Sequence, residues 1–163
     1  MNHMLLMRRR SLSCLPLLCA LLISGGCNSS PPGPQSGLPV VQVKIGSKAY
    51  NVEVAADNYS REKGLMERDS MPGDHGMIFV FDDESERSFW MHNTRIPLDI
   101  LFLDSNGSVV SIHTMKPYDE STTPSEKPAK YAIELNAGEA AACGVKVGDQ
   151  LTIPAAAPTS RPQ

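Results

Sequence analysis

LDILFLDSNGSVVSIH, residues 98–113, is the stretch that decides the fold class. Two apolar runs, Leu98–Asp104 and Val109–His113, flank the turn Ser105–Ser108, which contains Asn-Gly. Asn-Gly accepts the positive φ angles of a tight hairpin turn, so this pair between two apolar runs is a strong hairpin signal. The stretch therefore predicts two antiparallel strands.

Short apolar stretches on both sides of this hairpin predict further strands. Apolar residues alternate over 41–45 and 50–54 around Gly46-Ser47, which predicts a second hairpin. The other predicted strands are Gly76–Phe81, Arg87–His92, Tyr131–Leu135 and Gln150–Ile153. About eight short strands, mostly joined by short turns, predict a mainly β fold, a compact antiparallel β-sandwich or small barrel. No strand–helix alternation supports a parallel sheet.

Two short helices are expected beside the strands, plugging the ends of the fold. Asn58 can cap a helix that runs to about Met66, with Gly64 as an unusual interior residue. Asn136 starts the second, with Glu139 three residues on as a capping box and Gly144 as the stop.

Residues 1–26 have the layout of a secretory signal. Arg8–Arg10 form a positive region, and an apolar segment of about Leu15–Ile23 follows, which is short for a membrane span. Removing this signal leaves 12 basic and 18 acidic residues, a net charge of −6. An acidic domain without a basic stripe argues against nucleic acid as a partner.

Ser24-Gly25-Gly26 before Cys27 is similar to the lipobox of bacterial lipoproteins, in which the cysteine thiol carries a lipid. That box usually has an aliphatic residue where this chain has Ser24. We expect lipidation at Cys27 and hence export and membrane anchoring, with Asn28 favouring the outer membrane or its periplasmic face. The alternatives are a cleaved signal with a free Cys27, an uncleaved anchor, or a Cys27–Cys143 disulfide.

The remaining chain divides into three parts. Residues 27–39 are rich in Pro, Ser and Gly and predict a flexible linker. Residues 40–153 form the predicted β-rich domain, which we expect to be monomeric, and 154–163 form a disordered tail.

Several motifs in this domain resemble the DUF 192 family, a domain of unknown function. The motifs are REKGLMER (61–68), GMIFVF (76–81), FWMHNT (89–94), IPLDI (96–100) and ELNAG (134–138). The resemblance covers about Val41 to Ile153, with His92 where the family commonly has lysine. It implies a compact β-rich fold and brings no established activity, substrate or cofactor.

The FWMHNT segment is the main candidate for ligand binding. In a strand, Trp90, His92 and Thr94 would share one side. An indole with Asn93 nearby suits a sugar ring or another flat polar ligand, because the ring stacks while polar groups orient. The alternative is a core Trp90, with Asn93-Thr94 in an Asx-type turn.

Asp99 and Glu134 are the carboxylates of interest. Asp99 could bind a ligand hydroxyl or act as a base, or it could pair with Arg61, Arg68 or Arg95 or bond backbone amides. We include Arg61 and Arg68 in the candidate binding set with Trp90, Asn93, Thr94 and Asp99. Glu134 could complete a two-carboxylate pair with Asp99, although a solvated Glu134 is the default expectation.

The sequence favours a non-catalytic envelope module that binds a small polar ligand, glycan or partner protein. The alternative is a hydrolase that uses Asp99 with His92 or Glu134. A minor alternative is Cu(I) binding by methionine and histidine, for which core filling is the simpler explanation. No cofactor or metal is predicted, since phosphate-loop and zinc spacings are absent from the sequence. Cys143 is expected to be a buried structural cysteine.

Overall fold

The computed structural model describes residues 33–154. The signal, Cys27, the first part of the predicted linker and nearly all of the predicted tail lie outside the described residues, and those expectations remain predictions. Among the described residues, no helix is both long and apolar enough to cross a membrane.

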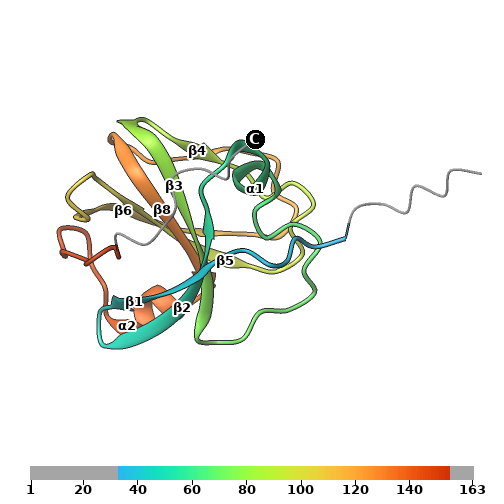
Figure 1. Cartoon of the computed structure of the whole chain (residues 1–163), viewed down its shortest axis with the longest axis horizontal. Helices are drawn as coiled ribbons and strands as arrows, with labels where there is room; N and C mark the ends of the chain where they lie inside the picture. The colour runs from blue at the N-terminus through green and yellow to red at the C-terminus, as the bar shows by residue number, and fades with distance from the viewer. Residues whose placement is uncertain (1–32, 155–163) are drawn as a thin grey trace, which may run out of the picture. The chain divides into compact units, whose positions relative to one another are not determined.

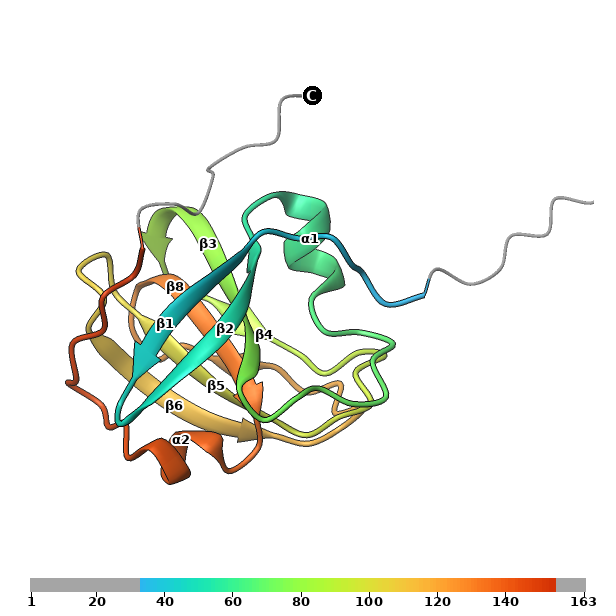
Figure 2. The same ribbon diagram turned by 60° about the horizontal axis from the view of Figure 1, so that its bottom comes forward.

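The described chain is mainly β, as predicted (Figures 1 and 2). Its elements are β1 (Val40–Ile45), β2 (Lys48–Ala55), α1 (Asn58–Lys63), β3 (His75–Ser85), β4 (Ser88–Phe89), β5 (Leu98–Leu103), β6 (Val109–Met115), β7 (Thr123–Pro124), β8 (Ala129–Asn136) and α2 (Glu139–Cys143). Both views place α1 and α2 at opposite ends of the large sheet.

Six strands form one sheet in the order β1-β2-β3-β8-β5-β6, and β4 pairs with β7 in a small second sheet. No closed barrel forms within residues 33–154. The large sheet is antiparallel except at β2 and β3, which pair in parallel. Parallel neighbours need a crossover connection, and α1 lies in it. The expectation of an all-antiparallel sheet was therefore wrong at this pair, because α1 is too short to give a clear alternation signal.

The sheet is apolar on both faces. One face, here named the α2 face, packs against Ala140 and Cys143 and carries Ile78, Val80, Leu101, Leu103, Ile133 and Leu135. The other, here named the loop face, is covered by Leu65, Met91 and Ile96 and carries Met77, Phe79, Leu98, Ile100, Phe102 and Ala132. Successive strand residues point to opposite faces, so each central strand contributes to both cores.

Local structure differs from expectation at four places. The predicted strand Arg87–His92 is reduced to the two residues of β4, and residues 150–153 make only an isolated bridge between Ser108 and Gln150. Asp57, one residue before the predicted cap, caps α1 by accepting the Ser60 amide at 2.9 Å. Helix α2 starts after Gly138, which provides no side-chain cap.

Candidate functional site

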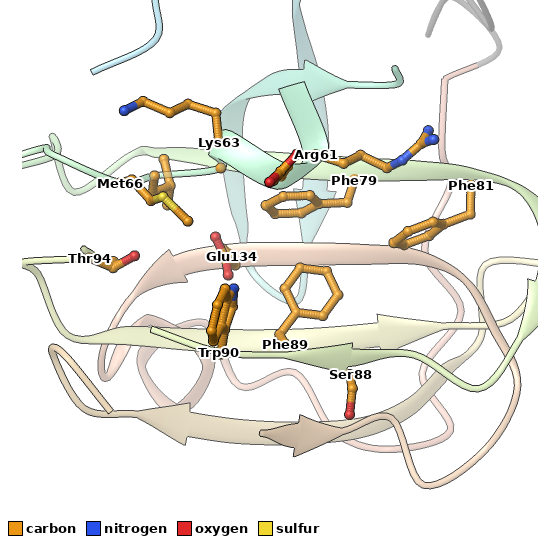
Figure 3. A pocket seen from close by; sticks show the side chains of 13 residues that line it. Arg61, Lys63, Met66, Phe79, Phe81, Ser88, Phe89, Trp90, Thr94 and Glu134 are labelled. Carbon is orange, nitrogen blue, oxygen red and sulfur yellow. The ribbon is translucent and has the colours of Figure 1, made fainter. Parts of the chain in front are cut away.

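A pocket of about 240 Å³ opens on the loop face (Figure 3). Its lining comes from four segments far apart in the sequence: residues 61–66 at the end of α1, Phe79 and Phe81 of β3, Ser88, Phe89, Trp90 and Thr94 after β3, and Glu134 of β8. The parallel β2–α1–β3 connection places the end of α1 over these strands, so the fold itself creates the hollow.

Glu134 is the buried acid of this pocket. It is 4% exposed, although its neighbours Ile133 and Leu135 point to the α2 face. Met77 of β3 and Ile100 of β5 are its cross-strand partners, so apolar side chains flank it on both sides. Figure 3 shows its carboxyl group pointing into the pocket. The default expectation of a solvated Glu134 was therefore wrong, because β8 is an interior strand with both faces covered.

The Glu134 carboxyl has no hydrogen-bond or ion-pair partner within residues 33–154. Burial raises the pKa of this carboxyl to about 8, since removal from water disfavours the charged form. At neutral pH the group is therefore mostly the neutral acid. The fully enclosed side-chain nitrogen and oxygen atoms without a partner in residues 33–154 are Arg68 Nε and His113 Nε2. The Glu134 oxygens are thus accessible from the pocket, where a ligand could bind them.

Aromatic rings form the walls around Glu134. Phe79 and Phe89 make an edge-to-face contact with ring centroids 4.9 Å apart, and Phe89 also contacts Phe81. Trp90 is 49% exposed and stacks on His92 at 4.8 Å. The alternative of a core tryptophan is therefore wrong, and the indole stands at the rim of the pocket, where a ligand can reach it.

Three loops meet beside Thr94 at the edge of the pocket, and each contains a non-glycine residue in the left-handed region: Glu67, Asn93 and Tyr118. The Glu67 amide donates to the Asn93 carbonyl at 2.9 Å, and the Tyr118 amide donates to the Thr94 carbonyl at 3.1 Å. Such backbones cost roughly 1–3 kcal/mol each and cluster at functional sites. Their concentration here is evidence of function that is independent of Glu134.

Asp99 lies on the α2 face, away from the pocket. Its carboxylate accepts the Thr114 hydroxyl at 2.7 Å and the amides of Gly138 and Ala140 at 2.8 and 3.0 Å. It thereby caps α2, in place of the Asn136 capping box that the sequence predicts. Of the roles considered for Asp99, the bonding of backbone amides is the one that the structure contains.

Glu134 and Asp99 cannot act as a pair. The Cα partner of Asp99 on β8 is Leu135, and the partner of Glu134 on β5 is Ile100. Because side chains alternate along each strand, the two carboxylates point to opposite faces of the sheet.

The other predicted residues divide between the pocket and structural roles. Thr94 lines the pocket, whereas Asn93 is exposed in the turn beside it. The guanidinium of Arg61 donates to the carbonyls of Ala56 and Val80, and Arg68 forms a two-pronged pair with Glu53 at 2.6 and 2.9 Å.

His92 lies outside the pocket lining, and its Nδ1 is 2.9 Å from Glu120. Sequence reasoning missed Phe79 and Phe89 as pocket walls, since apolar residues in strands predict core.

Metal binding finds little support in the described part of the chain. Residues 33–154 contain no group of three or more His, Cys, Asp or Glu side chains arranged to hold a metal ion. Met77, Met91 and Met115 are buried among apolar neighbours in the loop-face core.

Comparison with known proteins gives consistent matches. The DUF192 family model, described as an uncharacterized ACR, matches residues 41–153. A UPF0127 protein of Pyrococcus furiosus is 36% identical over 108 residues, which cover 64% of this chain and 89% of that protein.

Two solved structures are also similar. A candidate transcription regulator from Sinorhizobium meliloti has 40% identity and a TM-score of 0.65, covering 68% of this chain and 89% of that one. A protein of unknown function from Novosphingobium aromaticivorans has 36% identity and a TM-score of 0.67, covering 77% of this chain and 94% of that one.

Proposed function

Since the chain belongs to the DUF192 family, a family of unknown function, we propose from its own geometry that it is a binding module that takes one small ligand into the Glu134 pocket. The observation that carries this proposal is the Glu134 carboxyl, which is buried, unpartnered within residues 33–154 and directed into the cavity. Concave, mostly apolar pockets with a few polar groups are the usual form of small-molecule sites.

Binding is favoured over hydrolysis by the isolation of Glu134. Glycoside cleavage needs two carboxyl groups within about 5–10 Å on either side of the scissile bond. Asp99 lies on the opposite face, and His92 is engaged by Glu120. The raised pKa of Glu134 would suit a general acid, but Asp99 and His92, the partners that the sequence suggests for hydrolysis, are both absent from the pocket lining.

We extend the proposal to the cell envelope, with the domain tethered by a lipid on Cys27. The support is the order of features in the sequence: a positive region, an apolar segment, small residues and then cysteine. Metabolic labelling with an alkyne fatty acid should mark the wild-type protein and leave Cys27→Ser unlabelled. Equal labelling of both would refute the anchor.

Ligand binding can be followed through Trp90, because the chain contains a single tryptophan. A screen of fragments of roughly ten heavy atoms, the size range that the cavity suggests, should yield compounds that change the Trp90 emission. The same compounds should raise the melting temperature, since a ligand at a hundred times its Kd adds about 2.7 kcal/mol of stability.

The matched variants are Trp90→Ala, at the pocket, and Tyr59→Ala, an exposed aromatic of α1 outside the lining. Active fragments should lose their stabilising effect on Trp90→Ala and keep it on Tyr59→Ala. Fragments that stabilise both variants as well as the wild type would show that they bind elsewhere, and a screen without any active fragment would contradict the proposal.

A further inference from the structure

We propose that the ligand of the Glu134 pocket is a small organic cation, whose ammonium group pairs with the carboxyl group that points into the pocket. This inference rests on the proposed small-ligand pocket and adds the chemical class of the ligand. It is argued from the charges that point into the pocket, from its walls and from its size.

The charge argument begins with the basic side chains at the rim. Figure 3 shows the guanidinium of Arg61 and the amino group of Lys63 pointing away from Glu134. The Arg61 guanidinium is held by the carbonyls of Ala56 and Val80 and by the Asn58 side chain at 2.6 Å. Glu134 is thus not neutralised by a cation of the described chain, and its carboxyl faces the space that a ligand would occupy.

The aromatic walls of the pocket also favour a positively charged ligand. The faces of Phe79, Phe89 and Trp90 carry the negative end of the ring quadrupole, which attracts cations. The rim already contains this interaction, because the Arg87 guanidinium lies 4.0 Å from the centroid of Phe81. A carboxylate is then the natural counter-ion, since an ammonium group that leaves water needs hydrogen-bond acceptors as well as aromatic faces.

Size limits the ligand further. The cavity of about 240 Å³ exceeds the ~150 Å³ that holds benzene in an engineered protein core. A primary amine on one ring or on a short chain, with roughly ten heavy atoms, would fill it. This range fits a single small group better than a whole oligosaccharide or peptide.

The proton balance follows from the neutral state of Glu134. An R–NH₃⁺ cation binds to the carboxylate, and the proton of the carboxylic acid leaves to solvent, so one proton is released for each cation bound. Below the pKa of about 8, deprotonation opposes binding, and affinity should rise about tenfold per pH unit.

Few other titratable groups face Glu134. α1 contributes Arg61, Glu62 and Lys63 to the lining, and the segment after β4 contributes Trp90 and Thr94. Met77 and Ile100 flank Glu134 on the neighbouring strands. Ile100 of β5 lies between Glu134 of β8 and His113 of β6 in the sheet register. The imidazole Nε2 of His113 is 3.5 Å from the Glu126 carboxylate.

The test is calorimetric titration of the full-length purified protein with benzylammonium, benzyl alcohol and benzoate, which share one ring and differ in charge. Between pH 5.5 and 8, the affinity for benzylammonium should rise about tenfold per pH unit and then level off. Titration at pH 6 in two buffers of different ionisation enthalpy should show the release of one proton. Binding of benzyl alcohol should not change with pH.

Two variants separate charge from shape. Glu134→Gln keeps the volume of the side chain and should weaken benzylammonium binding at pH 8 at least about tenfold, abolish its pH dependence and leave benzyl alcohol unaffected. Glu86→Gln removes an exposed acid outside the pocket lining and should change the affinity for benzylammonium less than about twofold.

The outcomes distinguish this inference from the proposed function. If benzyl alcohol or benzoate binds at Trp90 and benzylammonium binds no tighter at pH 8, the cation class is refuted while the pocket stands. If none of the three compounds binds, the cation class is also refuted, and the fragment screen alone decides the proposed function.

Discussion

The two faces of the large sheet each bury one carboxyl group, and the two groups are treated in opposite ways. Asp99 on the α2 face is 2% exposed and accepts three hydrogen bonds. Glu134 on the loop face is 4% exposed and has no partner within residues 33–154. The two acids are therefore buried to the same degree, and they differ in the number of hydrogen bonds that their oxygen atoms accept.

The faces also differ in their backbone. On the α2 face, the left-handed positions around α2 are glycines, Gly138 and Gly144. At the edge of the pocket, such positions are held by Glu67, Asn93 and Tyr118. Glycine adopts this region without steric cost and asparagine at a small one, whereas glutamate and tyrosine do not. The α2 face is therefore relaxed where the pocket edge is strained at Glu67 and Tyr118. The four predictions below test this contrast.

The largest effect is expected for Asp99→Ala. Removing the carboxylate leaves the partly buried amide of Gly138 and the buried amide of Ala140 without an acceptor, which should lower the free energy of unfolding by about 4 kcal/mol. Urea denaturation at pH 7 measures this loss. Thr114→Val is a milder control, which removes one hydrogen bond to Asp99 and should cost about 1 kcal/mol. A loss below 1 kcal/mol for Asp99→Ala would show that Asp99 is not the structural acid that the contrast requires.

The second effect has the opposite sign. The Glu134 carboxyl binds its proton more tightly in the folded state than in the unfolded state. The free energy of unfolding of the wild type should therefore fall as pH rises from about 4.5 to about 8. Glu134→Gln removes this penalty and should be more stable than the wild type by about 3 kcal/mol at pH 7.

Denaturant unfolding of both proteins across this pH range measures the difference, which should vanish near pH 4. A wild type whose stability rises between pH 5 and 8 relative to Glu134→Gln would mean that the carboxyl has a partner.

A smaller effect is expected for Tyr50→Phe, on the α2 face. The Tyr50 hydroxyl donates to Glu139 at 2.7 Å, and this bond, with help from Lys48, lowers the pKa of Glu139. Loss of the bond should cost about 1 kcal/mol at pH 7. Because the pKa of Glu139 is lowered in the folded state, the stability lost in Tyr50→Phe should shrink as pH falls through that pKa. Thermal unfolding of both proteins at pH 7 and pH 3 measures this loss. An equal loss at the two pH values would contradict the account.

The smallest effect concerns the strained pocket edge. Tyr118→Gly relieves a left-handed tyrosine with φ of 58°, and after the entropy cost of glycine it should gain about 0.5 kcal/mol. Gly144→Ala, with φ of 76° at the end of α2, should lose about 1 kcal/mol. Chemical denaturation of both variants compares the two regions directly, and a loss of stability in Tyr118→Gly would remove the evidence for strain.

The sequence pattern predicted those parts of the fold that depend on residues close together in the chain. The hairpins β1–β2 and β5–β6 were predicted because alternating residues and tight turns specify them within about 15 residues. The reduction of Arg87–His92 to β4 was not predictable, because β4 pairs only with β7, in a polar stretch without a strand signal. The parallel pairing of β2 with β3 likewise depends on a distant arrangement.

The site was predicted in part for the same reason. Trp90 and Thr94, two of the predicted binding residues, line the pocket. The alternation of Ile133, Glu134 and Leu135 indicates that the acid points away from its apolar neighbours. The sequence does not show that β8 is an interior strand, and an interior strand has no solvated side. The walls, Phe79 and Phe89, have the same pattern as ordinary core residues.

The strand order has a consequence for how the chain folds. The two hairpins can form early, because their strands are adjacent in sequence, but they are joined in the sheet only through the centre, where β3 pairs with β8 across about 50 residues. Closing such long loops before any pairing energy is gained slows folding to roughly milliseconds or seconds. The Glu134 pocket needs β3 and β8 together, so it is among the last features of the fold to form.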